Sequence, residues 1–165
     1  MYLMEIRKVL GDWLSKADKI VIIGVGNPLR KDDAIGLEVI HRLKANVSEH
    51  VYLINSETIP EDYIGLISDF KPTHILIIDA ALISNKSGVM KFVEDWSDSR
   101  IPVLTHALPI QIFCAYLKEL THAKIAMLLI QPKDVDFGEG LSVELKETAD
   151  MIASYLLNIP VIGKR

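Results

Sequence analysis

Acidic side chains stand at the ends of two apolar runs in this sequence, and a histidine occupies a third loop. Asp32 and Asp33 close a loop that contains two glycines, and Asp79 directly follows an apolar run. His106 precedes a helical pattern. Two carboxylates and an imidazole suit a divalent transition metal, and three such ligands leave coordination positions open. The sequence therefore predicts a site that captures a metal transiently.

The glycine-containing loop, Gly24 to Gly36, also admits a dinucleotide-binding interpretation. That interpretation needs Gly-x-Gly-x-x-Gly and a helix N-terminus able to receive a pyrophosphate, but Asp32 and Asp33 place negative charge there. Phosphate binding is therefore disfavoured. For Asp32 we expect a helix-capping role, because an aspartate favours the positive end of the helix dipole. A cap for Asp33, and a turn in which Asp79 bonds nearby backbone amides, are the structural alternatives to chemistry.

Gly26 and Asn27 open the same loop and are expected to contact a substrate. Glycine permits close approach and unusual dihedral angles, and asparagine offers backbone and side-chain hydrogen bonds. The structural alternative is a plain strand-to-helix turn. Either role places these two residues a few positions ahead of the paired aspartates.

Continuous apolar runs alternate with helical patterns along the chain and must position these loops. Strands buried on both faces of a largely parallel sheet are predicted at 20–23, 51–54, 75–78 and 125–130. Helices are predicted at 34–45, 60–70, 109–120 and 143–157, and an edge strand at 89–94. We therefore expect an α/β fold, a three-layer sandwich with a mostly parallel central sheet of about five strands and helices on both faces. Ligands in such sheets bind beyond the carboxyl ends of the strands.

Composition limits the architecture and the function classes. A chain of 165 residues, 50% of them hydrophobic and 24% charged, predicts a single domain over 1–165, with a helical extension at 1–18. The net charge of -4 provides no basic stripe for nucleic acid. No apolar run reaches the roughly 18 residues that a membrane span needs. Cys114, the only cysteine, excludes an internal disulfide framework, predicts a cytoplasmic location and has the pattern of a packed core thiol.

Four segments, in this order, resemble the hydrogenase maturation proteases and together span nearly the whole chain: Gly24 to Asp33, Asp79, Thr105-His106-Ala107-Leu108-Pro109, and Ile130-Gln131-Pro132. The segment from Thr105 to Pro109 and the segment from Ile59 to Asp62 look closest to the branch that serves formate-hydrogenlyase-type and related membrane-bound hydrogenases. Three departures concern the substrate more than the activity, and one of them is the helical extension before residue 19. Ala34 stands where the family often has glycine, and Ser56-Glu57-Thr58 replaces a glycine pair.

The resemblance implies an endopeptidase that removes the C-terminal tail from the nickel-loaded large-subunit precursor of a nickel-iron hydrogenase. The nickel belongs to the precursor and serves as a recognition element, so no permanently bound cofactor is expected. Carried over by position, the nickel contacts fall on Asp33, Asp79 and His106. Asp32 is then a neighbour. Water is activated by Asp33 or Asp79 as a general base, or the nickel acts as a Lewis acid.

The alternative from another class is a non-catalytic metal-binding or nucleotide-binding α/β module. Such a module explains the alternation of strands and helices and the acidic loops, but not the full set of family segments. As a protease, the protein has the hydrogenase large-subunit precursor as its expected partner. It is expected to be a monomer or a small homo-oligomer.

Overall fold

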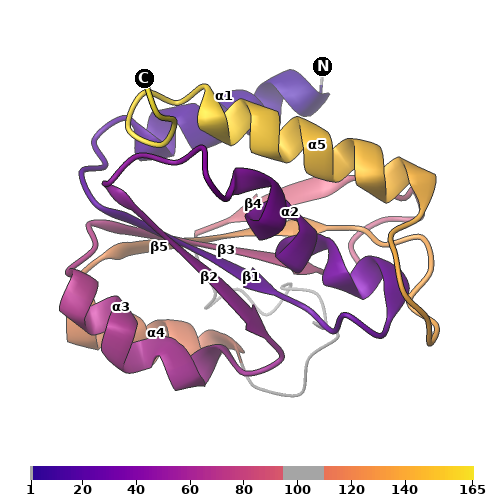
Figure 1. The fold of residues 1–165 in the computed structure, drawn as a ribbon, viewed down its shortest axis with the longest axis horizontal. Coiled ribbons are helices and arrows are strands. Elements are labelled where there is room, and N and C mark those ends of the chain that lie inside the picture. Colours follow the sequence, from indigo (N-terminus) through magenta and orange to yellow (C-terminus); the bar gives the residue numbers. More distant parts are fainter. Residues whose placement is uncertain (1, 95–109) are drawn as a thin grey trace.

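The computed structural model describes residues 2–94 and 110–165, which form a five-stranded sheet with helices on both faces (Figure 1). The strands are β1 (Ile20–Val25), β2 (Val51–Glu57), β3 (His74–Ala80), β4 (Met90–Val93) and β5 (Lys124–Ile130). Their order across the sheet is β2-β1-β3-β5-β4, and every neighbouring pair is parallel except β5 with β4. The carboxyl ends of β2, β1, β3 and β5 therefore lie at the same end of the sheet.

Two layers of helices enclose the sheet. The helices are α1 (Tyr2–Leu14), α2 (Ile35–Leu43), α3 (Ile64–Phe70), α4 (Ile110–Thr121) and α5 (Val143–Leu157), and the 3-10 turns η1 (Lys31–Ala34) and η2 (Pro60–Tyr63) open α2 and α3. Helices α1, α2 and α5 cover one face, and α3 and α4 cover the other (Figure 1). Successive strand side chains point to opposite faces, so Ile20 and Ile22 join the first core and Val21 and Ile23 the second. The expected three-layer α/β fold is confirmed.

The strand predictions hold at the centre of the sheet and fail in part at one edge. β1 and β3 are buried throughout, and β5 is buried after its first residue. The prediction that the second strand is buried on both faces is wrong. β2 forms an edge of the sheet, where the helix layers cover it incompletely, and Tyr52 and Leu53 are only partly buried. The edge strand expected at 89–94 is confirmed as β4. No helix in the described part of the chain is long and apolar enough to cross a membrane.

Glycine allows the start of α2 to pack directly on the backbone of the central strands. A Cβ atom on Gly36 would lie 2.3 Å from the carbonyl oxygen of Ile78 and 2.6 Å from that of Val25. A Cβ atom on Gly24 would lie 2.4 Å from the carbonyl oxygen of Gly36. These contacts are with backbone atoms, which cannot rotate away. The glycines thus fix the turn that precedes α2 against the ends of β1 and β3.

The sequence Ile-Gly-Leu occurs twice, around Gly36 and around Gly65, and a comparison of these two glycines tests the packing. Gly36 and Gly65 are each the second residue of a helix, but a Cβ atom on Gly65 would meet nothing within 4 Å. We expect Gly36→Ala to lower the free energy of unfolding by about 3 kcal/mol, because the added methyl group overlaps rigid backbone. Gly65→Ala should instead raise it by about 0.5 kcal/mol, because alanine has the higher helix propensity. Urea unfolding measures both, and equal effects of the two substitutions would contradict the packing described here.

Candidate active site

Asp33 lies in η1, the turn between β1 and α2, and is 0% exposed. Its carboxylate Oδ2 accepts the backbone N–H of Asn27 at 3.1 Å. Gly26 packs on the same turn, because a Cβ atom there would lie 2.2 Å from the carbonyl oxygen of Asp33. The loop that leaves β1 is therefore folded closely around this carboxylate.

Asn27 shapes the loop with its side chain as well as its backbone. Its Oδ1 accepts the N–H of Leu29 at 2.9 Å, and its carbonyl oxygen accepts the N–H of Arg30 at 3.1 Å. An asparagine that bonds the backbone two residues ahead is typical of a turn. Gly26 and Asn27 thus have the structural role that the sequence allowed, and their contact with a substrate stays a prediction.

Asp79 is the penultimate residue of β3 and is 1% exposed. Its Oδ1 accepts the N–H of Ala80 at 2.8 Å. β3 is the neighbour of β1, and Gly36 holds the start of α2 against the carbonyl of Ile78, the residue before Asp79. Asp33 and Asp79 therefore lie at the same end of the two central strands, where open α/β sheets bind their ligands.

Asp33 and Asp79 are two carboxylates buried at the same end of the sheet, and their negative charge must be compensated there. A buried carboxylate is unfavourable unless hydrogen bonds or a cation compensate for the lost hydration, and nearby like charges add repulsion. His106, the third predicted metal contact, lies outside the described residues. Within 2–94 and 110–165, no three His, Cys, Asp or Glu side chains are grouped so that they could hold a metal ion. The three-residue set stays a prediction.

Asp32 does not cap a helix, and that prediction is wrong. The N-cap positions of η1 and α2 are Arg30 and Ala34. The buried Asp32 carboxylate instead accepts four hydrogen bonds from the β5–α5 loop, residues 131–142. Its Oδ2 accepts the N–H groups of Lys133 at 2.9 Å and Asp134 at 3.0 Å and the hydroxyl of Ser142 at 2.9 Å, and its Oδ1 accepts the Ser142 N–H at 2.7 Å. The backbone donors lie more than a hundred residues further along the chain. Their hydrogen bonds compensate the buried carboxylate charge, and neither η1 nor α2, both within the described residues, has a side-chain cap hydrogen bond.

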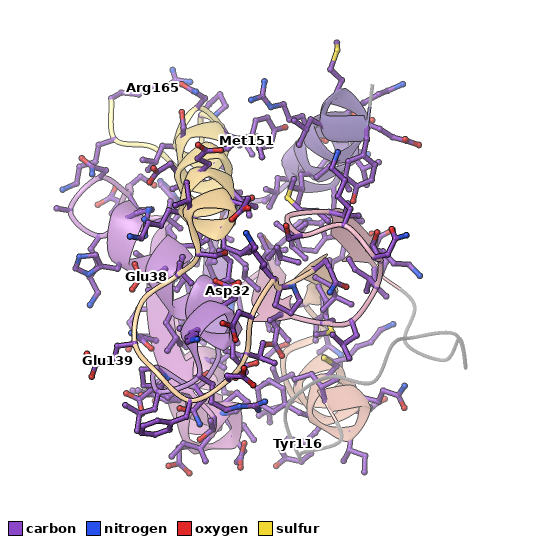
Figure 2. The ribbon with its side chains drawn as sticks, turned by 90° about the vertical axis from the view of Figure 1, so that its right-hand side faces the viewer. Asp32, Glu38, Tyr116, Glu139, Met151 and Arg165 are labelled. Carbon is purple, nitrogen blue, oxygen red and sulfur yellow. The ribbon has the colours of Figure 1, made fainter. Side chains whose placement is uncertain are left out.

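Further bonds join the same two loops. The N–H of Lys31 donates to the carbonyl of Gly138 at 3.0 Å, and the N–H of Gly138 donates to the carbonyl of Leu29 at 2.8 Å. Lys31 Nζ and Asp134 Oδ2 are 2.6 Å apart, and this hydrogen bond is the main cause that lowers the pKa of Asp134. Figure 2 views this end of the molecule, with Asp32 beside the loop that carries Glu139. The loops after β1 and β5 are thus a single ordered unit.

Two other side chains order this end of the sheet, Gln131 and Ser56, and both were named from the sequence without a prediction of this role. Gln131 Oε1 accepts the N–H groups of Ile83 at 2.7 Å and Ser84 at 2.9 Å, and so fixes the chain just after Asp79. Ser56 Oγ donates to the carbonyl of Gly24 at 3.0 Å, where the pairing of β1 with β2 shifts register. A polar residue directly after a buried apolar run was the signal available for Gln131.

The remaining candidate side chains have structural environments. Cys114 is fully buried in α4, and burial raises the pKa of its thiol to about 12, so at neutral pH it is a protonated core residue and not a nucleophile. His74 is buried beside the ring of Trp13, and burial is the main cause that lowers its pKa. His41, His50 and His122 are exposed. The placement of Cys114 confirms the packed core thiol that the sequence predicted.

Removal of the Asp32 carboxylate should loosen the β5–α5 loop. We expect Asp32→Ala to lower the free energy of unfolding by roughly 3 kcal/mol, because buried backbone donors lose their acceptor. Hydrogen exchange at the amides of Lys133, Asp134 and Ser142 should become faster. Asp136→Ala is the matched control in the same loop, because Asp136 is exposed, and it should change stability by less than about 0.5 kcal/mol. Unchanged protection of these amides in Asp32→Ala would contradict the tethering role.

Comparisons with known proteins place this chain in a family. A family model described as hydrogenase maturation protease matches residues 37–159, a range that includes Asp79 and begins after Asp33. A putative hydrogenase maturation protease of Methanocaldococcus jannaschii is 37% identical over 161 residues, which cover 93% of this chain and 95% of the relative. The Hydrogenase 3 maturation protease of Escherichia coli K12 is 26% identical, over 80% of this chain and 85% of the relative. The crystal structure of a [NiFe] hydrogenase maturation protease, HycI from Thermococcus kodakarensis, superposes with a TM-score of 0.82 at 35% identity and covers 91% of this chain and 99% of that one. The chain therefore belongs to the hydrogenase maturation protease family, and it is a protease.

Proposed function

We propose that this protein removes the C-terminal tail from the nickel-loaded large-subunit precursor of a nickel-iron hydrogenase, and that Asp33, Asp79 and His106 contact the precursor's nickel. The observation that supports the proposal most strongly is the burial of Asp33 and Asp79 at one end of the two central strands. Membership of the maturation protease family supplies the reaction class. The forms of Thr105 to Pro109 and of Ile59 to Asp62 further favour a formate-hydrogenlyase-type hydrogenase as the substrate.

The hydrogen bonds at the two carboxylates suit a metal that arrives with the substrate. Asn27 donates to Asp33 and Ala80 donates to Asp79, so each carboxylate is oriented by a backbone N–H. An ionised carboxylate has two oxygens with about four acceptor positions, so hydrogen bonds of this kind are compatible with metal coordination. Ligands oriented before the substrate binds lose little conformational freedom when the nickel docks. The protease thereby recognises a precursor whose metal centre is complete.

Two routes to hydrolysis fit this arrangement. In the first, Asp33 or Asp79 accepts a proton from water as the water attacks the scissile carbonyl, and the proton passes on to the leaving amine. In the second, the precursor's nickel polarises the carbonyl or the water. Both routes break one peptide bond and consume one water molecule. The buried Cys114 thiol, with its raised pKa, supports neither route.

The alternative, a non-catalytic nucleotide-binding module, fits the loop poorly. A dinucleotide site leaves space beside its glycines for a pyrophosphate, whereas the space beside Gly26 is filled by the carbonyl of Asp33. The buried carboxylates of Asp32 and Asp33 also place negative charge at the start of α2. Both features oppose phosphate binding at this helix end.

Cleavage of matched precursors tests the proposal. Purified protease is incubated with nickel-loaded and nickel-free forms of the large-subunit precursor from its own source, and release of the tail is followed by mass spectrometry. We expect cleavage of the loaded form only. Asp33→Asn, Asp79→Asn and His106→Ala should each lower the rate by on the order of 100-fold or more, because each removes a contact used in the transition state.

Asp69→Asn is the control, because Asp69 is exposed on α3 and the substitution makes the same chemical change. It should cleave at the rate of the unsubstituted protease. Equal cleavage of loaded and nickel-free precursors would refute nickel recognition. Full activity of Asp33→Asn or Asp79→Asn would refute the assignment of that residue.

A further inference from the structure

Large apolar side chains stand exposed on the loops that surround the candidate site. Leu29 follows β1 and is 47% exposed, and Phe137 follows β5 and is 83% exposed. Ile59 and Leu82, on the loops after β2 and β3, are exposed as well. All four loops leave the sheet at the carboxyl ends of the strands, where Asp33 and Asp79 lie. Exposed apolar side chains gathered beside a site are a sign of a protein-binding surface.

Leu29 and Phe137 are joined through the backbone. Gly138, the residue after Phe137, donates its N–H to the carbonyl of Leu29 at 2.8 Å, and its carbonyl accepts the N–H of Lys31 at 3.0 Å. Arg30 and Gly138 form a parallel β-bridge. The two apolar side chains therefore project from adjacent backbone segments, and Leu29 is four residues before Asp33.

The loop that carries Phe137 is ordered by bonds on both sides of its tip. Asp32 holds Lys133, Asp134 and Ser142, and Asp134 Oδ1 accepts the N–H of Asp136 at 2.9 Å. The phenyl ring is nevertheless left in water. An aromatic ring loses favourable burial free energy in that position, and it regains this when a partner covers it. A ring presented by an ordered loop also loses little conformational freedom on binding.

Charges next to this ring define what kind of partner fits. Asp136 and Glu139 flank Phe137 on either side and are exposed, and Figure 2 shows Glu139 at the outer side of the molecule. Two of the basic residues close by, Lys31 and Lys133, form ion pairs with Asp134 and Glu144. The third, Arg30, donates its Nε–H to the carbonyl oxygen of Val135 at 3.2 Å. Among the described residues, neither Asp136 nor Glu139 makes an ion pair of its own. A complementary surface has an apolar centre with basic residues around it.

We propose that Phe137 and Leu29 form an apolar anchor that docks the large-subunit precursor beside the cleavage site, with Asp136 and Glu139 contacting basic residues of the precursor. This inference rests on the proposed function. The precursor is the occupant because Leu29 lies four residues before Asp33, on the loop that Gly138 joins to the loop of Phe137. A second copy of the protease on this surface would instead obstruct the site. Asp32 is a positioning residue, since it holds the anchor loop without contacting the precursor.

Steady-state cleavage of the nickel-loaded precursor tests the anchor, with Leu120→Ala as the control. Leu120 is 43% exposed, close to the value for Leu29. It lies near the end of α4, just before β5 begins, and therefore at the opposite end of the strands from the candidate site. We expect Phe137→Ala to raise KM about tenfold or more, and Leu29→Ala to raise it several-fold, with much smaller changes in kcat. Leu120→Ala should leave KM unchanged. Phe137 is largely exposed, so Phe137→Ala should keep the melting temperature of the unsubstituted protease, and the two leucine variants, which lose similar partly exposed side chains, should resemble each other in melting temperature.

Salt provides a second measurement with the same proteins. The KM of the unsubstituted protease should rise with ionic strength, and the Asp136→Asn and Glu139→Gln double variant should show a weaker salt dependence. A KM for Phe137→Ala within twofold of that for Leu120→Ala, in a protease that cleaves normally, would overturn the anchor and leave the proposed function standing. Self-association of the protease that Phe137→Ala abolishes would overturn it too. If no precursor is cleaved but binding of the precursor still depends on Phe137, the anchor is supported and the proposed function fails.

Discussion

A buried carboxylate, that of Asp32, joins the two loops from which the candidate site is built. It accepts three backbone N–H groups and one hydroxyl from the β5–α5 loop, and these bonds hold η1 against that loop. A charge buried in this way is stable only while its donors remain in position. The position of Asp33, the order of the Phe137 loop and the start of α5 at Ser142 all depend on that set of bonds.

Asp32 and Asp33 are neighbours in sequence with separate roles, and the geometry of the 3-10 turn explains the separation. Three residues per turn direct consecutive side chains about 120° apart. Asp32 therefore bonds the β5–α5 loop, while Asp33 bonds Asn27 in the loop that leaves β1. Gly24, Gly26 and Gly36 then allow the turn to lie directly on backbone atoms of β1 and β3. Close packing of backbone on backbone sets the spacing between Asp33 and β3, the strand that carries Asp79.

The sequence predicted the sheet, the helices and the end of the strands at which Asp33 and Asp79 lie, because apolar runs and helical periodicity report burial directly. It predicted too much burial for β2, since an apolar run does not reveal that the strand forms an edge of the sheet. The Asp32 cap failed for a related reason. Its donors lie 101 to 110 residues further along the chain, so only the folded chain shows that they compete with the helix end. The exposure of Phe137 was equally hidden, because an isolated phenylalanine in a loop does not reveal whether it is buried.

We propose that Asp33, Asp79 and His106 contact the nickel of the docked precursor. Nickel X-ray absorption measures this directly, on the loaded precursor alone and on its complex with the protease, with the precursor altered at the scissile bond so that the complex persists. We expect oxygen or nitrogen ligands to join the nickel in the complex, and we expect them to be lost when the protease has Asp79→Asn. A nickel coordination shell that is the same in the free precursor and in the complex would contradict it.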